Sequence, residues 1–205
     1  DEACREASKQ EIIRRYYKCL CEKRRNGTTK DDICKLELLM KQAEITVEDR
    51  KVTIVALERE KNENGNPAMA IELRDGTIVS GGTSELLGAA SSALINALKV
   101  LAGIDKEVKL IDPKAIDPIQ DLKINYLGSK NPRLHTDEVL TALSATAANN
   151  EIAMKAMKKL PLLKGCDAHS TVLLSSVDEQ IFKKLGIQLT CEPKYEEDER
   201  MYHKN

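Results

Sequence analysis

The clearest hydrophobic pattern in the chain is a pair of short alternating segments joined by a turn. From residue 68 to residue 73, large apolar side chains occupy every second position, which is typical of a strand with one buried face. Asp75 and Gly76 follow, and this dipeptide favours a two-residue hairpin loop. The pattern therefore predicts a β-hairpin in which Leu73 lies opposite Ile78.

A helical segment without charged residues follows the hairpin. No charge occurs from Leu86 to Leu98, and small residues fill the first part of this segment. Such a helix is covered on most sides, and its small residues let other backbones approach closely. We therefore expect the hairpin and this helix to form the core of an α/β domain.

Further segments of strand character alternate with segments of helical period. Together they predict strands at residues 68–73, 77–80, 108–111, 171–174 and 187–190. Asp117 before Pro118 predicts the start of a helix that ends at Gly128, and Ser176 with Glu179 predicts the start of another. Helices between strands imply parallel pairing outside the hairpin. The predicted fold class is α+β or α/β: a helical arm followed by a mixed-sheet sandwich with one antiparallel hairpin.

The arm is marked by the strongest break in the chain. Residues 1–65 have a helical pattern throughout, and Asn-Gly-Asn-Pro at residues 64–67 ends it. The predicted organisation is a helical subdomain at 1–65, an α/β domain at 66–192 and a charged tail at 193–205, for which we expect no fixed structure.

Composition narrows the function classes. The 32 Lys and Arg residues nearly balance 33 Asp and Glu residues, so no global field favours nucleic acid or an anionic membrane. Aromatic platforms for stacked bases are scarce, because there is one Phe and no Trp. No apolar run is long enough to span a membrane. We therefore expect neither a nucleic-acid nor a membrane partner.

The cysteines indicate the redox compartment. They form no C-x-x-C pair, and a chain of this length does not need a disulfide framework. We expect reduced thiols and a cytoplasmic location. The residues concerned are Cys4, Cys19, Cys21, Cys34, Cys166 and Cys191.

Two short polar segments carry the best candidate ligand site. His135 opens a helix beside an arginine, and His169 enters a strand. Loops at the ends of strands are where α/β folds place their sites, and arginine offers a forked donor to carboxylate or phosphate. A structural role, in which each histidine bonds local backbone, remains the alternative. The candidate ligand-binding residues are Arg133, His135, Thr136, Asp137, His169 and Ser170.

A weaker anion-site candidate precedes the uncharged helix. Exposed N–H groups at a helix start could hold an anion at Gly81, Gly82, Thr83 and Ser84. No Gly-Lys-Ser/Thr follows, and Glu85 would repel an anion, so a simple strand-to-helix turn remains the alternative. The chain offers no set of three or four metal ligands at usable spacing. We predict no metal and no cofactor, and assign no catalytic residue.

Three segments resemble an uncharacterised bacterial family, number eighteen-forty-six of the domain-of-unknown-function series. They read E-A-S-K-Q-E-I-I-R-R-Y-Y at residues 6–17, L-G-S-K-N-P-R-L-H-T-D-E-V-L at 127–140 and G-C-D-A-H-S-T-V-L-L-S at 165–175. The resemblance is to the C-terminal part of the family, whose members are longer and carry a phosphate-loop-like G-P-G-S-G-K segment in their N-terminal part. It implies a chain without that nucleotide site, and it assigns no catalytic residues.

A second resemblance concerns the fold alone. Hairpin, small-residue helix, strand and Pro-opened helix are similar to the core of the cytidine-deaminase-like fold. In that fold, His/Cys-x-Glu and Pro-Cys-x-x-Cys bind zinc and move protons. Here the two helices begin with A-A-S-S at residues 89–92 and P-K-A-I at residues 113–116. The zinc ligands and the glutamate are absent, which argues against zinc deamination.

These observations favour a C-terminal structural or interaction region of a longer cytosolic bacterial protein. We expect it to pack against the missing phosphate-loop-like N-terminal domain or a sister subunit, and to form a homo-oligomer. The alternative is half of a shared active site or ligand cleft, which binds an anionic small molecule through Arg133, His135 and His169. That alternative requires the two histidines to meet in space, and whether the chain is an enzyme stays open.

Overall fold

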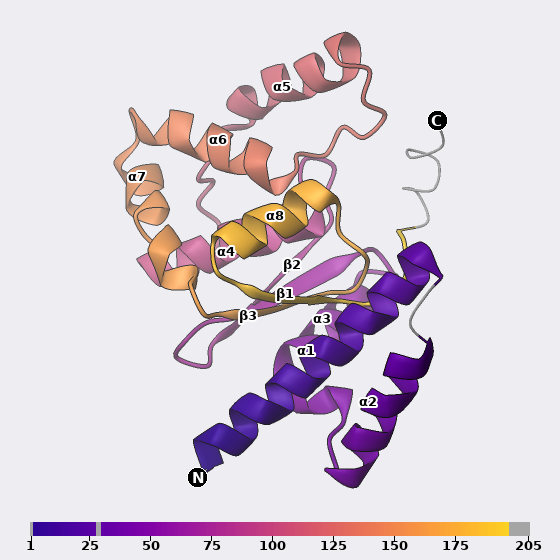
Figure 1. The fold of residues 1–205 in the computed structure, drawn as a ribbon. Coiled ribbons are helices and arrows are strands. Elements are labelled where there is room, and N and C mark those ends of the chain that lie inside the picture. The colour runs from indigo at the N-terminus through magenta and orange to yellow at the C-terminus, as the bar shows by residue number, and fades with distance from the viewer. Residues whose placement is uncertain (1, 28–29, 197–205) are drawn as a thin grey trace.

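The computed structural model of the chain describes residues 2–27 and 30–196. Its centre is a four-stranded mixed sheet with the strand order β2-β1-β3-β4 (Figure 1). β1 is antiparallel to both of its neighbours, and β3 is parallel to β4. The strands are β1 at Ala68–Glu72, β2 at Ile78–Gly82, β3 at Asp167–Ser170 and β4 at Gln188–Cys191. The predicted fold class, a mixed sheet with one antiparallel hairpin, is confirmed.

Helices cover both faces of this sheet (Figure 1). On one face lie α1 and α3, from the arm, with α2 packed beside α1. The elements of the arm are α1 at Glu2–Asn26, α2 at Lys30–Gln42, a short 3-10 turn at Val47–Asp49 and α3 at Lys51–Asn62. The Thr46 amide donates to Asp49 at 2.8 Å, which stabilises the turn before α3.

The other face carries the main hydrophobic core around α4. This helix runs through Ala89–Ala102 and ends at Gly103, which adopts φ 61°. Further elements enclose the core: α5 at Pro113–Asp121, a π-helical turn at Leu122–Tyr126, α6 at Thr136–Ala147, α7 at Glu151–Met157, a 3-10 turn at Leu160–Leu163 and α8 at Ser176–Lys184.

The hairpin loop is one residue longer than predicted. Glu72 pairs with Ile78, and the Leu73 amide donates to the Thr77 carbonyl at 2.8 Å, so Leu73 does not lie opposite Ile78. The loop is Arg74–Gly76, and of these residues only Gly76 has positive φ, at 84°. A loop of this length needs a left-handed residue at one position, which glycine supplies.

Two predicted strands are wrong. Residues 108–111 form no strand, although Leu110 and Ile111 are buried in the main core as part of a loop. Residues 171–174 leave the sheet, and β3 lies before them instead. Leu173 packs against Cys21 of α1, so tertiary contact buries this apolar run without strand pairing. The resemblance to the deaminase-like core depended on a strand at residues 108–111. Because these residues form no strand, the structure does not support that resemblance.

Two helix starts also differ from prediction. Asp112 caps α5 by accepting from the Lys114 amide at 2.9 Å, so Pro118 lies inside the helix rather than at its start. Ser175 caps α8, one residue earlier than predicted. Near the start of α5 the Asp-Pro pattern occurs twice, and near the start of α8 the Ser-x-x-acid pattern occurs twice. Local sequence does not show which of the two copies begins the helix.

The beginning of the predicted charged tail is attached to the fold. The Leu173 amide donates to the Lys194 carbonyl at 2.8 Å, and Arg24 lies 5.3 Å from the centre of the Tyr195 ring. Residues 197–205 of that tail lie outside the described residues. Among the helices that are described, none is both long and apolar enough to cross a membrane.

Candidate functional site

A small cavity lies where the first turns of three helices approach one another. We call it the α4 pocket. It has a volume of about 50 Å³ and is lined by residues 88–91 at the start of α4, the loop at 131–135 before α6, residues 172–175 before α8, and the side chains of Asp178 and Glu196. That volume holds a few water molecules or one small anionic group.

The loop before α6 is fastened to the start of α4. The Leu134 amide donates to the Leu86 carbonyl at 2.9 Å, and Leu87 forms an isolated parallel bridge with Leu134. The Ser91 hydroxyl donates to the Leu134 carbonyl at 3.0 Å. α4 itself begins after Gly88, which has no side chain to cap the first backbone N–H groups, and residues 88–91 line the pocket.

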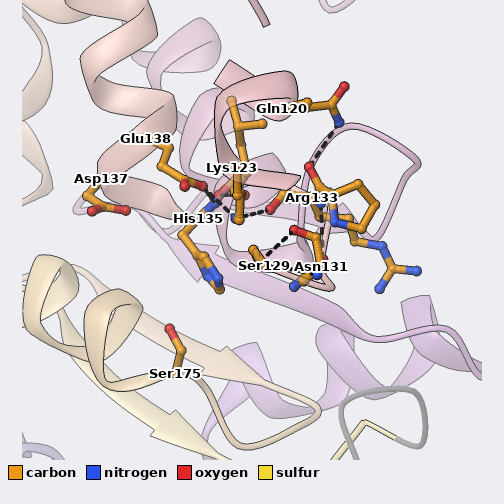
Figure 2. A network of polar contacts seen from close by, with 12 residues as sticks. Gln120, Lys123, Ser129, Asn131, Arg133, His135, Asp137, Glu138 and Ser175 are labelled. Atoms are coloured by element: carbon orange, nitrogen blue, oxygen red, sulfur yellow. Dashed lines mark hydrogen bonds and ion pairs between the residues drawn. The ribbon is translucent and has the colours of Figure 1, made fainter. Parts of the chain in front are cut away.

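A buried lysine holds the same loop from behind (Figure 2). The ammonium group of Lys123 donates to the Arg133 carbonyl at 2.7 Å and to Glu138 Oε2 at 2.8 Å. The same carboxylate oxygen accepts from the His135 amide at 2.7 Å, which closes a capping box at the start of α6. Arg133 and His135 therefore project from a backbone that is fixed on both sides.

Asp178 is the central acidic group of the site. Its Oδ1 accepts from the Thr136 amide at 2.9 Å and from the Thr136 hydroxyl at 2.8 Å. Its Oδ2 accepts from Ser175 Oγ at 2.8 Å and contacts His135 Nδ1 at 3.0 Å. Burial by itself would raise the pKa of Asp178, but these hydrogen bonds outweigh it and lower the pKa.

The histidine is oriented by this carboxylate. Since Asp178 is ionised, Nδ1 of His135 is protonated and donates a hydrogen bond to the Asp178 carboxylate. The other ring nitrogen, Nε2, has no hydrogen-bond partner among the described residues. The hydrogen bond to Asp178 raises the pKa of His135. In its cationic form His135 offers an Nε2–H donor, and in its neutral form it offers an acceptor at the same atom.

Arg133 is the second cationic group of the pocket. Its Nη1 donates to Glu196 Oε1 at 2.7 Å, and this is the one hydrogen bond of its guanidinium among the described residues. A guanidinium has five N–H donors, so most of the fork remains available for an anion.

The structure separates the two predicted histidines. His169 is fully buried on β3, where its Nδ1 contacts Thr190 Oγ1 at 2.9 Å and its Nε2 contacts Glu192 Oε1 at 3.2 Å. Its ring lies 4.9 Å from that of Tyr17 in α1, on the sheet face opposite α4. Burial lowers the pKa of His169. The predicted shared cleft, in which both histidines bind one ligand, is therefore wrong, because the sheet lies between the two histidines.

Some of the other predicted site residues lie at the α4 pocket, and others lie away from it. Thr136 is buried against Asp178, and Ser170 bonds the Val172 carbonyl at 2.8 Å. Asp137 is exposed and points away from Arg133 in Figure 2. The four residues of the predicted helix-start anion site do not precede the helix directly. Gly81 and Gly82 lie within β2, Thr83 lines the α4 pocket, and Ser84 bonds within its own turn.

Sequence reasoning missed three of the groups that shape the pocket: Lys123, Asp178 and Glu196. The Ser-x-x-Asp spacing at 175–178 is a helix-cap signal, but it does not reveal a bond to a residue 43 positions away. Residues 2–27 and 30–196 contain no group of three His, Cys, Asp or Glu side chains placed to hold a metal ion.

These features define a mixed α/β protein with a small polar pocket at the meeting point of three helix starts. Two models of one family match the chain: Domain of unknown function DUF1846, N-terminal, at residues 1–44, and Domain of unknown function DUF1846, C-terminal, at residues 48–202. The chain belongs to this family.

Curated relatives agree with this assignment. A UPF0371 protein of Corynebacterium urealyticum is 53% identical over 195 residues, which cover 95% of this chain and 39% of the relative. A UPF0371 protein of Streptococcus thermophilus is 51% identical over 204 residues, which cover 100% of this chain and 41% of the relative. The chain therefore spans about two fifths of the length of these relatives.

The family match corrects the predicted role and partner. Residues 1–44 match the N-terminal family model, so the chain is not a C-terminal region alone, and the match to the Streptococcus thermophilus relative covers 100% of this chain. A structural role built on packing against a separate N-terminal domain is wrong for the same reason. Homo-oligomer formation stays a prediction.

Proposed function

We propose that the α4 pocket binds the phosphate or carboxylate group of a small anionic ligand through Arg133 and His135. The observation that carries the proposal is that both side chains and the uncapped start of α4 line one cavity. Each of the three is a donor of positive electrostatic character, and each has donors left over after its contacts within the protein.

The three donors have different parts in binding. The Arg133 fork matches two oxygens of a planar carboxylate or of a phosphate. His135 adds an Nε2–H donor below its raised pKa. The N–H groups at the start of α4 supply neutral donors and the positive end of the helix dipole. Ser175 and Thr136 keep Asp178 in place, and this fixes the histidine ring.

The proposal includes a cytoplasmic location, which the lack of a C-x-x-C pair in the sequence supports. It includes no reaction. The deaminase-like resemblance adds none, because neither α4 nor α5 begins with zinc ligands or a glutamate.

Calorimetric titration of the purified protein with inorganic phosphate and with acetate tests the proposal. We expect Arg133→Ala to weaken binding at least about tenfold, because a charge-assisted bond of this kind contributes about 1.5–3 kcal/mol. His135→Asn should weaken it too. The asparagine amide can still donate to Asp178 in place of Nδ1, while the Nε2 donor is lost.

Lys130→Ala is the matched control, because it removes an exposed cation from the same loop outside the pocket lining. It should bind like the wild type. Melting temperatures of Arg133→Ala and Lys130→Ala should stay close to that of the wild type. If neither anion binds the wild type, or if Lys130→Ala weakens binding as much as Arg133→Ala, the proposal is wrong.

A further inference from the structure

The α4 pocket adjoins a larger hollow, and the two share three lining residues, one of which is Glu196. The pocket has a volume of about 50 Å³, and the outer hollow has a volume of about 460 Å³. Both are lined by Pro67, Val172 and Glu196. Of these three residues, Glu196 is the one that bonds Arg133, so a ligand whose charged group sits on Arg133 and whose remaining part extends into the outer hollow meets the Glu196 carboxylate.

Glu196 lies at the end of a segment that is attached behind it. The Glu192 amide donates to the Ser170 carbonyl at 2.9 Å, and the Leu173 amide donates to the Lys194 carbonyl at 2.8 Å. The Lys194 ammonium bonds Glu60 Oε2 at 2.8 Å. These bonds hold residues 192–194, whereas among the described residues the side chain of Glu196 is held by its bond to Arg133.

The charges of the pocket also point to Glu196. With Asp178 engaged by His135, Thr136 and Ser175, the Arg133 charge is met by the Glu196 carboxylate. The pair is largely shielded, since the side chains are 26% and 14% exposed. A carboxylate in that position uses the same kind of bond that an anionic ligand would use, so the two compete for one guanidinium.

We propose that Glu196 is an internal competitor of the ligand and that ligand binding displaces its carboxylate from Arg133. The inference rests on the function proposed above and narrows its ligand class. The ligand carries a phosphate or carboxylate group for the α4 pocket and a polar body for the outer hollow, where Asn64, Asn66 and Lys194 are lining groups. Glu196 thereby sets how strongly an anion must bind in order to enter.

Titration calorimetry with inorganic phosphate on Glu196→Gln tests the displacement. Glutamine keeps the size of the side chain and removes the competing charge, so we expect phosphate to bind about fivefold more tightly than to the wild type. Glu60→Gln is the matched control, because it breaks the ion pair with Lys194 on the same segment without touching Arg133. Its affinity should equal that of the wild type within about twofold.

A double variant shows whether the gain passes through Arg133. Glu196→Gln added to Arg133→Ala should give no gain over Arg133→Ala alone, because the competition no longer exists. If the wild type binds phosphate and Glu196→Gln binds no more tightly, or if Glu60→Gln gains as much, the displacement is wrong and the anion site stands. If the wild type binds neither phosphate nor acetate, the anion site and the displacement are both wrong.

Discussion

At the scale of single residues, the pair of His135 and Asp178 links the candidate site to stability. The hydrogen bond to Asp178 raises the pKa of the folded-state histidine above its usual value of 6.5. A group with a raised folded pKa stabilises the fold fully below its unfolded pKa, and this contribution is lost as pH rises through the folded pKa. Asp178 has a lowered pKa, so its own contribution is lost only in acid, as pH falls below 3.8.

We therefore predict that the free energy contributed by His135 falls between about pH 6 and pH 9. The measurement is urea unfolding of the wild type and His135→Asn at both pH values. His169 has the opposite shift, because burial lowers its pKa, but it is present in both proteins and cancels in the comparison. Lys123 and Glu138, the other charged groups beside His135, also remain unchanged. Equal pH dependence of the two proteins would contradict the prediction.

At the scale of elements, close packing between β2 and α4 explains the glycines before the helix. A Cβ added at Gly81 would collide with the backbone of Ala93 in α4, and one added at Gly82 would collide with the carboxylate of Glu63. Backbone cannot rotate away from such a contact, whereas a flexible side chain can. Gly81 therefore serves the approach of helix to sheet, and α4 owes its position over the hairpin to it.

We predict that Gly81→Ala lowers the free energy of unfolding by about 1–3 kcal/mol, as overpacking of a filled core does. Chemical denaturation provides the measurement. Gly88→Ala is the control, because its Cβ would meet nothing within 4 Å and its φ of −68° suits any residue. Because alanine is a poorer N-cap than glycine, that variant should lose about 0.5–1 kcal/mol, less than Gly81→Ala. Equal losses in the two variants would show that helix and strand adjust freely.

At the scale of the whole molecule, Arg50 joins the arm to the sheet. It stands at the start of α3 and is only 1% exposed. Its guanidinium is fully used: Nε donates to Thr190 Oγ1, Nη1 to Asp167 Oδ1 and Gln10 Oε1, and Nη2 to the carbonyls of Ala168 and Gln188. One side chain thus connects α1, α3, β3 and β4, so the arm at 1–65 is packed onto the sheet.

We predict that Arg50→Ala costs about 3–5 kcal/mol of unfolding free energy, because Asp167 and four further acceptors lose a shared donor. Arg59→Ala, on the same helix α3, removes a surface pair with Glu63 and should cost less than about 1 kcal/mol. Thermal and urea unfolding of both variants give the comparison. A loss in Arg50→Ala no larger than that in Arg59→Ala would show that the arm is held by apolar contacts alone.

The sequence by itself determined the features that depend on near neighbours. Alternation predicts β1, and the absence of charge predicts the covered helix α4, because these signals act over a few residues. Arg133 and His135 were also within reach of sequence reasoning, as donors in a loop that opens a helix.

The tertiary structure decided everything that joins distant segments. Leu110 and Leu173 are apolar residues in short runs that read as strands, yet both are buried by packing outside the sheet, since burial alone does not specify pairing. His169 is placed on the far side of the sheet by the alternation of β3, and Asp178 and Glu196 reach the pocket from 43 and 63 positions away. Such contacts depend on how the helices pack over the sheet, and no local pattern encodes their partners.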